Sequence, residues 1–554
     1  MPIEYVKETY QIQLKPLLMR SVLYFGNKEG VYSPDHDGGE FRCTWREEYD
    51  RICRLANALK KLGIERGDKV GTFAWNTHRH GELSLAVPLM GSVFHPTNIR
   101  YGKEHLVYAI NHSTDRIMFV DEDLIPLLED IKDELRSVEC YVVMAPLTRP
   151  PQTKLSPVYC YEELLGQASP VYDFPDDIPE TSLAMLTYTG GTTGLPKGIG
   201  WSPRSIVLSV FGLIGPDQVD LCEEDSVMPV VNLFHVNAHN FALATAMLGG
   251  RLVWPGPHPS PEDQLSLIAR EKVTYFQGAT AVLMFAMQEW DKGKYDLSSL
   301  KKIYSGSTAP NQALIEALEN KGLRLHWTYG MAEGRVISNT VTSRRKHMEA
   351  WSREKYLKKM THQGLPMPGV EVRVVNLDTG QDVAWDGKER GEVVVRGLWT
   401  GQEYYNAPEA TSKVFKDGWL HTGDVAVIEE DGYLYLVDRI KDIIKSAGEW
   451  ISSVDLEDAI MDNPVVRQAA VFGIPHPRWE ERPVAAVVLK DEHRGKVAEE
   501  DIIAPLCSQF AKWWLPDHVL FLDELPMTGT MKVMKRVLRD MWREGKLKPL
   551  SSNK

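Results

Sequence analysis

The sequence predicts an α/β protein with largely parallel sheets. Two observations support this class: apolar residues recur at helical spacing in several segments, and short buried-strand patterns alternate with those segments along the chain. The length of 554 residues and the apolar fraction of 43% are enough for several domain-sized units with their own cores. No internal repeat or low-complexity tract interrupts the pattern.

The first elements follow each other closely. Ile52, Leu55, Leu59 and Leu62 predict a helix over 49–62, and Gly63 stands where a helix ends. The other segments in this half read as alternating strands and helices, and the proline-rich stretch 146–157 reads as a surface connection. We expect strands at 69–75, 117–120, 140–144 and 183–188, and helices at 82–90 and from 202 onward.

The second half continues the alternation. A strand from 303 enters a glycine turn, strand-rich stretches cover 370–375 and 391–396, and the C-terminal part mixes helices with strands. We expect helices at 454–461, from 498 onward and at 533–542, and strands at 469–473 and 484–489. The last helix carries one apolar stripe, formed by Val533, Met534, Val537, Leu538, Met541 and Trp542.

Composition limits the class of partner and the compartment. The net charge is −13, with 76 acidic against 63 basic residues, so nucleic acid is not favoured as a partner. The six cysteines form no Cys-x-x-Cys pair, which indicates free thiols in a reducing compartment. The N-terminus has no secretory signal, and no segment approaches about 18 uninterrupted apolar residues. We therefore expect a cytoplasmic protein without a membrane span.

One glycine- and threonine-rich segment, 186–198, lies between a predicted strand and a predicted helix. Backbone N–H groups exposed by glycine, with threonine hydroxyls, can surround phosphate oxygens that Lys197 then neutralises. The segment is not a Walker A loop, because Lys197 follows Pro196 and precedes Gly198. A phosphate cradle is one reading, and an ordinary surface turn is the other.

This segment resembles the phosphate-loop signature of the adenylate-forming superfamily, which includes acyl-CoA synthetases, luciferases and peptide-synthetase adenylation domains. The signature is Tyr-(Ser/Thr)-(Ser/Thr)-Gly-Thr-Thr-Gly-x-Pro-Lys-Gly. The sequence departs from it at Gly190, where the family carries a hydroxyl. The resemblance implies phosphate contacts from Thr189, Gly191, Thr192, Thr193, Gly194 and Lys197.

A second motif, Trp327–Glu333, resembles the family's Tyr-Gly-x-Thr-Glu. The resemblance implies that Tyr329 lies on adenine and that Glu333 holds Mg²⁺, a hard cation often shared with nucleotide phosphates. Ala332 replaces a threonine that contacts the α-phosphate in the family. By the same resemblance, the other residues of the nucleotide site are Thr328, Gly330, Gly306, Ser307 and Thr308.

Two later motifs imply a ribose site and a hinge. Asp424, which ends 417–424, matches the family's ribose-binding aspartate, although a Gly-Asp pair is also common in turns. Arg439 would add a ribose contact, and Lys441 matches the hinge between a large domain, 1–438, and a small mobile α+β domain, 439–554. The expected thiol-transfer face comprises Lys445, Ser446, Ala447, Gly448, Glu449 and Trp450.

The acyl pocket is expected around the segment 228–239 and the segment 273–282. His235 and His239 would share a face if helical, which also allows a metal site, but the resemblance favours the acyl-pocket wall. Histidine at 239 replaces a tryptophan that is frequent in long-chain synthetases. Gly278 and Ala279 would leave room for substrate, although tight packing explains small residues equally well.

A last motif, 525–532, matches the family's Pro-(Lys/Arg)-Thr-x-x-Gly-Lys. Lys532 keeps the lysine that stabilises the charge formed during adenylation. Met527 and Met531 replace the basic residue and the glycine of this motif, and methionine does not readily take the backbone angles of glycine. Basic residues gather in 532–554, where they could meet CoA phosphates or form a solvated tail, and the basic run 344–347 reads as a solvated face.

The resemblance covers about residues 20–545 and is greatest to bacterial medium- and long-chain acyl-CoA synthetases. It implies that a carboxylic acid, MgATP and CoA are converted through acyl-AMP to a thioester, AMP and pyrophosphate. Because Gly190, Ala332 and Met531 weaken phosphate contacts, we expect impaired adenylation and competent thioester formation from supplied acyl-AMP, which a separate adenylating ligase could provide. We also expect a homodimer.

Three alternatives stay open. One is an ordinary ATP-dependent fatty acyl-CoA synthetase with tolerated motif changes. A second enzyme class delivers the acyl group of acyl-AMP to a carrier-protein thiol or an amine. The third is a pseudoenzyme that binds nucleotide without turnover.

Overall fold

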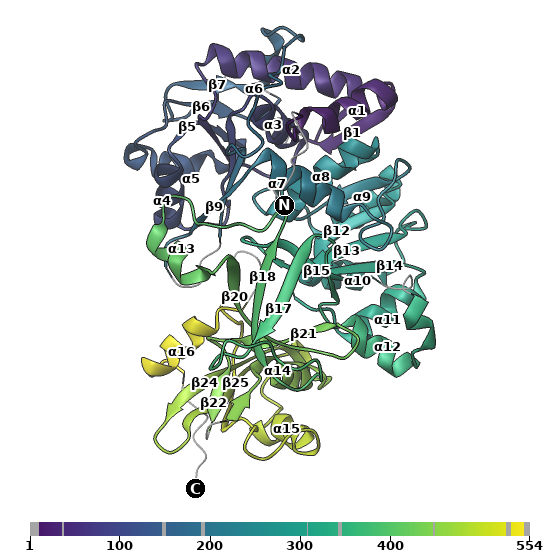
Figure 1. Cartoon of the computed structure of the whole chain (residues 1–554), viewed down its shortest axis with the longest axis vertical. Helices are drawn as coiled ribbons and strands as arrows, with labels where there is room; N and C mark the ends of the chain where they lie inside the picture. The colour runs from purple at the N-terminus through teal and green to yellow at the C-terminus, as the bar shows by residue number, and fades with distance from the viewer. Residues whose placement is uncertain are drawn as a thin grey trace, which may run out of the picture. The chain divides into compact units, whose positions relative to one another are not determined.

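The computed structural model describes residues 10–35, 38–146, 151–189, 194–306, 308–341, 346–446, 449–527 and 533–547. It confirms the α/β class (Figure 1). The chain divides into two compact units. The first holds Met1–Thr189, Leu195–Val372 and Val395–Leu420, and the second holds Gly190–Gly194, Arg373–Val394 and His421–Lys554.

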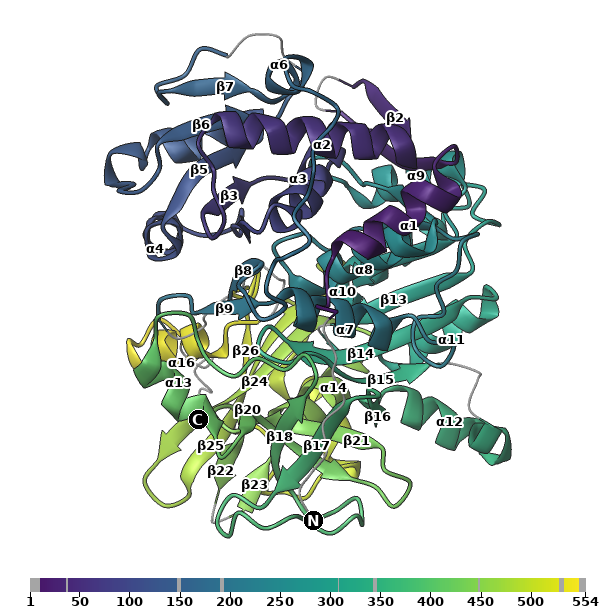
Figure 2. The same cartoon turned by 45° about the horizontal axis from the view of Figure 1, so that its top comes forward.

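The first unit contains a seven-stranded sheet among its described residues, in the order β7-β6-β5-β3-β4-β8-β9. All neighbours are parallel except β8 and β9, which are antiparallel. Helix α2 packs beside α3 and α6 (Figure 2). The strands are β3 (Lys69–Phe73), β4 (Val93–Pro96), β5 (Asp115–Val120), β6 (Cys140–Val143), β7 (Val158–Cys160), β8 (Met185–Tyr188) and β9 (Gly198–Trp201); the helices are α2 (Trp45–Lys61), α3 (His78–Leu89), α4 (Lys103–Ser113), α5 (Ile125–Glu129) and α6 (Tyr161–Gly166).

A nine-stranded sheet, counted over the same described residues, completes the first unit, in the order β16-β15-β14-β13-β12-β10-β11-β1-β2. Its central strands are parallel, and β2, β15 and β16 run antiparallel to their neighbours. The strands are β1 (Glu29–Pro34), β2 (Glu40–Thr44), β10 (Ser226–Pro229), β11 (Arg251–Val253), β12 (Tyr275–Ala279), β13 (Lys302–Gly306), β14 (Arg324–Met331), β15 (Arg335–Val341) and β16 (Leu365–Pro366). The helices that follow the same stretch of chain are α1 (Lys15–Phe25), α7 (Pro203–Leu213), α8 (Val236–Leu248), α9 (Pro261–Glu271), α10 (Thr280–Trp290), α11 (Gln312–Asn320), α12 (Arg353–Met360) and α13 (Pro408–Val414).

Two smaller sheets follow along the chain. One has the order β17-β18-β20-β19 with β21 beside β20, and the other has the order β23-β22-β25-β24 with β26 beside β25. Their strands are β17 (Val370–Val375), β18 (Gly391–Gly397), β19 (Phe415–Lys416), β20 (Trp419–Ile428), β21 (Leu434–Arg439), β22 (Ile444–Ser446), β23 (Glu449–Ile451), β24 (Val466–His476), β25 (Glu480–Leu489) and β26 (His518–Phe521). The helices of the C-terminal part are α14 (Ser453–Met461), α15 (Glu499–Ile503) and α16 (Lys535–Arg543).

Local sequence explains where several elements begin. Thr44 and Glu47 form a capping box, which starts α2 four residues before the predicted 49–62 helix. Ser202 caps α7 where a helix was predicted, but β9 precedes it, so the phosphate-loop segment leads into a second strand rather than directly into a helix. The predicted apolar stripe of the last helix is confirmed in part: Leu538 is fully buried in the C-terminal core.

All six cysteines are free thiols. Cys222 and Cys507 are exposed, and the other four are buried. The described helices include none with the length and apolar character needed to span a membrane.

Candidate functional site

Hydrogen bonds hold the two ends of the phosphate-loop segment together. Thr189 N donates to Lys197 O at 2.9 Å, and Lys197 N donates to Thr189 Oγ1 at 3.3 Å. The Tyr101 hydroxyl donates to Thr189 O at 3.1 Å. The segment between them therefore starts and ends at a fixed point beside the paired strands β8 and β9.

Within this segment, Gly194 has φ +116°, a conformation that side chains with a Cβ rarely adopt. This angle explains why glycine stands at that position of the motif. Four other predicted phosphate-loop residues, Gly190, Gly191, Thr192 and Thr193, lie outside the described residues.

Lys197 and Glu333 both contact the same tyrosine, Tyr404. The Lys197 Nζ atom is 4.8 Å from the centroid of the Tyr404 ring, and the Tyr404 hydroxyl donates to Glu333 Oε1 at 2.7 Å. Gly401 N donates to Glu333 O at 2.8 Å, and the Glu333 residue is only 7% exposed. Burial, together with Glu333, raises the pKa of Tyr404, so its hydroxyl is a donor at neutral pH. The structure thus brings the predicted phosphate-binding lysine and the predicted Mg²⁺ ligand together.

A single buried carboxylate suits Mg²⁺, which usually keeps several water ligands and takes only one or two carboxylates besides phosphate oxygens. Glu333 meets this requirement, because its hydrogen-bond donor Tyr404 is neutral and leaves the carboxylate charge in place. The residues present therefore fit the predicted cation.

Tyr329 and Glu333 belong to the hairpin of β14 and β15. Tyr329 pairs with Ser338, and the register shifts at Gly330, which pairs with Val336. A Cβ at Gly330 would lie 2.0 Å from the carbonyl oxygen of Arg335, whose φ is +52°. The glycine of the Tyr-Gly pair is therefore required by the close approach of the two strands at this turn. Ala332 lies in the same turn.

Three predicted residues meet at the carboxyl ends of parallel strands. Gly306 of β13 pairs with Ala279 of β12 on one side and with Thr328 of β14 on the other. The Thr280 hydroxyl donates to Thr308 O at 2.6 Å, which holds the chain after β13. Ligands of open parallel sheets bind at this edge. Ser307 lies outside the described residues.

The two histidines of the predicted acyl-pocket wall do not share a helical face. His235 is the N-cap residue of α8, with φ −98° and ψ 127°, so the helix starts after it and the conditional pairing fails. His239 lies inside α8, is 1% exposed, and its Nε2 is 3.3 Å from Ser84 O. Burial, reinforced by the charge of Arg335, lowers the pKa of His239 to about 4, so it is neutral at pH 7. Among the described residues, no three His, Cys, Asp or Glu side chains are grouped as metal ligands.

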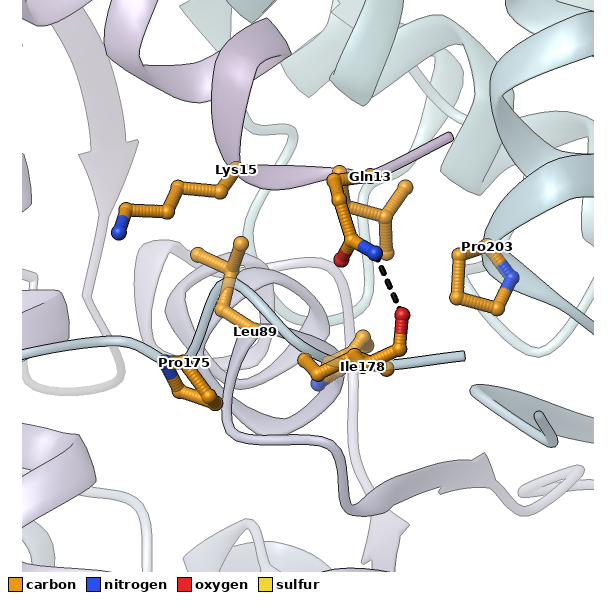
Figure 3. Close-up of a pocket in the computed structure, with 8 residues that line it drawn as sticks. Gln13, Lys15, Leu89, Pro175, Ile178 and Pro203 are labelled. Carbon is orange, nitrogen blue, oxygen red and sulfur yellow. Dashed lines mark hydrogen bonds between the residues drawn. The ribbon is translucent and has the colours of Figure 1, made fainter. Parts of the chain in front are cut away.

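Gly278 is explained by packing. A Cβ at this position would lie 2.6 Å from the Phe276 ring, so a larger residue would displace that ring. Beside His239, a small apolar hollow is lined by Leu14, Leu18, Leu85, Leu89, Leu243 and Ser84. A second hollow lies between Leu89 and Pro203, where Gln13 Nε2 donates to Ile178 O (Figure 3). Their cavity volumes, about 10 Å³ beside His239 and about 0 Å³ beside Gln13, are far below those of typical ligand pockets, which are about 300 Å³ or more.

In the second unit, Asp424 and Arg439 are register partners on β20 and β21. Arg439 Nε lies 2.8 Å from Asp424 Oδ1, and Asp424 is 4% exposed. Asp424 N donates to Thr422 Oγ1 at 3.1 Å, after Gly423 with φ +72°. The two residues predicted to contact ribose are therefore adjacent.

Lys441 follows β21, and its carbonyl accepts from Arg539 Nη2 at 3.2 Å. Burial lowers the pKa of Lys441. The exposed Lys445 pairs with Trp450 across β22 and β23, and Arg482 Nη1 donates to the buried Ser446 Oγ at 3.3 Å. The remaining predicted residues that lie outside the described ranges are Ala447, Gly448, Met531 and Lys532, and the side chain of Glu449 is also outside them.

Sequence profiles place this arrangement in a family. The profile of the AMP-binding enzyme family matches residues 21–405, and that of the AMP-binding enzyme C-terminal domain matches residues 455–532. The chain belongs to the AMP-binding enzyme family, within the adenylate-forming superfamily.

Individual relatives cover nearly the whole chain. A long-chain-fatty-acid–CoA ligase of Thermus thermophilus is 40% identical over 96% of this chain and 96% of its own length. A 3-methylmercaptopropionyl-CoA ligase of Ruegeria lacuscaerulensis is 36% identical over 96% of this chain and 99% of its own length. The crystal structure of the anthranilate CoA ligase AuaEII with anthranoyl-AMP has a TM-score of 0.85 at 24% identity, over 97% of this chain and 99% of that chain, which supports the fold.

Proposed function

We propose that the protein is an acyl-CoA ligase, which activates a carboxylic acid with ATP as acyl-AMP and transfers the acyl group to CoA. The observation that carries the proposal is the contact of Lys197 and Glu333 with Tyr404, because it joins a phosphate-binding cation to a cation-binding carboxylate. The names of the relatives, whose alignments cover nearly the whole of both chains, support the same reaction class.

Each residue of the site has a separate role in adenylation. Lys197 stabilises phosphate charge, Tyr329 stacks on adenine, and Asp424, oriented by Arg439, accepts hydrogen bonds from ribose. Glu333 would hold Mg²⁺, which supplies charge neutralisation on the phosphates. Lys532 is proposed to stabilise the charge that develops as the carboxylate attacks the α-phosphate.

Transfer to the thiol needs other residues than adenylation does. We place the hinge at Lys441, between domains 1–438 and 439–554, so that rotation of the small domain exchanges Lys532 for the face 445–450. The small-domain surface that receives CoA would be this face together with basic residues near α16.

We further propose that the adenylation half is weak. Gly190, Ala332 and Met531 each replace a group that serves the phosphates, and loss of one such donor typically costs on the order of 100-fold in rate. The thiol-transfer residues keep the family pattern apart from Ala447.

Two half-reactions test this division. Acid-dependent ATP–pyrophosphate exchange measures adenylation, and thioester formation from synthetic acyl-AMP and CoA measures transfer. We expect slow exchange with efficient transfer, and back-substitutions A332T and G190S should raise exchange without raising transfer. Rapid exchange by the unmodified protein would show an ordinary ATP-dependent synthetase. Acyl-AMP consumption without CoA thioester would indicate a carrier-protein or amine acceptor, and AMP binding without either half-reaction would indicate a pseudoenzyme.

A further inference from the structure

Arg335 is a buried cation surrounded by neutral groups. Its residue is 0% exposed, and its Nη1 donates to Ser209 Oγ at 2.8 Å and to Asn240 Oδ1. The guanidinium lies 4.2 Å from the centroid of the Trp201 ring. Within the described ranges, its Nε and Nη2 atoms have no hydrogen-bond partner.

Arg335 keeps its charge, and no residue of the described ranges acts as its counter-ion. Burial alone lowers its pKa to about 9, which still leaves the guanidinium protonated at neutral pH, and no carboxylate contributes to the shift. A buried charge is costly unless an opposite charge or a full set of hydrogen bonds compensates it. The aromatic ring and two neutral acceptors compensate only part of this cost, so an anion at the remaining edge would stabilise the site.

The unused edge has the geometry of a carboxylate-binding fork. The N–H groups of Nε and Nη2 point in parallel. In two other arginines of this chain, these two atoms bind both oxygens of a carboxylate: Arg116 binds Glu139 at 2.9 and 2.7 Å, and Arg396 binds Glu371 at the same distances. The unpaired, buried edge of Arg335 is therefore the same edge that other arginines of this protein use to bind carboxylates.

The location of Arg335 indicates which molecule brings the carboxylate. Arg335 is the first residue of β15 and pairs with Met331, in the hairpin that also carries Tyr329 and Glu333. Its side chain, however, contacts α7 and α8, and its charge acts on His239, whereas Glu333 contacts Tyr404 beside Lys197. The side chain of Arg335 therefore lies on the side of the predicted acyl-pocket wall. Lys197, the predicted phosphate-binding residue, lies elsewhere, beside Tyr404 and Glu333.

We propose that Arg335 binds a second carboxylate of the acid substrate, so that the protein activates dicarboxylic acids, with one carboxylate at the nucleotide and the other paired with Arg335. This proposal rests on the proposed acyl-CoA ligase function. Asn240 and Ser209 hold the guanidinium in position, and the neutral His239 leaves the charge of the pair unopposed.

The test compares straight-chain dicarboxylic acids with monocarboxylic acids of equal carbon number, from short to medium length. With the full-length protein, ATP, Mg²⁺ and CoA, and separately with the matching synthetic acyl-AMPs, thioesters are quantified by mass spectrometry. We expect kcat/KM for the best diacid to exceed that for its monoacid counterpart by more than about tenfold, with R335M reversing the preference. Because methionine replaces an uncompensated charge by an apolar chain of similar length, R335M should fold. R396M, which removes a surface fork, should keep the preference.

A second readout is independent of turnover. Saturating diacid should raise the thermal midpoint of the wild-type protein and not that of R335M. A wild-type preference for monoacids, or an unchanged preference in R335M, overturns the proposal while leaving the ligase function intact. Loss of AMP binding in R335M with an unchanged acid preference would assign the fork to a phosphate instead, and also overturns it. If no acid yields a thioester, the ligase function fails, and the diacid-dependent thermal shift alone decides whether Arg335 binds a carboxylate.

Discussion

Tyr404 connects two charged residues from distant parts of the sequence. Its ring receives the ammonium group of Lys197, and its hydroxyl binds the carboxylate of Glu333. One side chain therefore orients a cation and an anion, and does so without adding a charge of its own.

Substituting Tyr404 by phenylalanine separates these two functions. Y404F keeps the ring beneath Lys197 but removes the hydrogen bond to the buried Glu333, an interaction with a charged group worth about 1.5–3 kcal/mol. We expect the Mg²⁺ concentration needed for half-maximal adenylation to rise by roughly tenfold, with a smaller change in the KM for CoA. A Mg²⁺ titration of pyrophosphate exchange measures the effect.

The adjacent tyrosine provides the control. Tyr405 packs its ring near His112, so Y405F should leave the Mg²⁺ dependence unchanged. An equal shift in both variants would mean that the loop, rather than the hydroxyl of Tyr404, sets the dependence.

Residues with a sequence motif were predictable, and residues with only a spatial relation were not. Asp424 and Arg439 were both named from motifs, and the register of β20 and β21 makes them neighbours. Tyr404 and Arg335 belong to no motif, because their partners come from other elements and become visible only after folding. The sequence allowed two explanations for Gly278, room for substrate or tight packing. The close approach of the Phe276 ring supports tight packing.

At the scale of elements, α14 and α16 are joined by a buried ion pair. Lys535 Nζ lies 2.7 Å from Glu457 Oε1 and 2.6 Å from Ser453 Oγ, and Ser453 N donates to Asp438 Oδ2 at 2.7 Å. Burial opposes the charge of Lys535, but Glu457 and Asp438 outweigh it and raise the pKa of Lys535. Burial raises the pKa of Glu457, although Lys535 opposes this.

Removing the lysine should destabilise the C-terminal part in a pH-dependent way. K535M leaves Glu457 buried without its partner, which typically costs about 3–5 kcal/mol. Because the pKa of the folded-state carboxyl then lies further above its unfolded value, the penalty is present at neutral pH and shrinks as pH falls through the folded pKa. Urea unfolding at pH 7 and at pH 5 measures both effects, and the difference between variant and wild type should be smaller at pH 5.

The matched variant is K535M combined with E457Q. A neutral amide removes the buried charge, so the double variant should recover most of the stability lost by K535M at pH 7 and lose the pH dependence of that difference. A double variant as unstable as K535M would show that Lys535 acts through packing.

Periodicity predicted most long elements but misplaced short ones. The helices α2 and α14 and the strands β3, β5 and β6 lie where apolar spacing put them, within a few residues at each end. β9 was missed because four residues that include two glycines carry no strand pattern, although antiparallel pairing with β8 forms it. The helix expected from 498 is short, spanning only Glu499–Ile503.

At the scale of the whole molecule, the residues named from motifs are divided between the two compact units. Tyr329, Glu333 and Lys197 belong to the first unit, and Asp424, Arg439 and Lys445 belong to the second. The sequence could name these residues through motifs, but the rotation that we propose between the two half-reactions has no sequence signal beyond the match at Lys441.

Restricting the backbone at Lys441 tests the hinge. K441P fixes φ near −65°, which limits rotation between the two proposed domains. We expect thioester formation from supplied acyl-AMP to fall by more than about 100-fold, while AMP binding and the thermal midpoint stay close to those of the wild type. Stopped-flow transfer assays and calorimetry provide the measurements.

K441A keeps backbone freedom and removes the side chain, so it separates the two contributions. Equal loss of transfer in K441A and K441P would assign the effect to the ammonium group and would place the hinge elsewhere in the chain.

The two exposed thiols offer a direct way to observe such a motion. Cys222 belongs to the first unit and Cys507 to the second, and the remaining cysteines are buried. Burial and the nearby Asp225 raise the pKa of Cys222, whose Sγ donates to Asp225 Oδ2 at 3.3 Å, so it alkylates more slowly than an ordinary thiol. The native chain can therefore be labelled in sequence with a donor dye and an acceptor dye, and single-molecule energy transfer would follow the distance between the units during turnover.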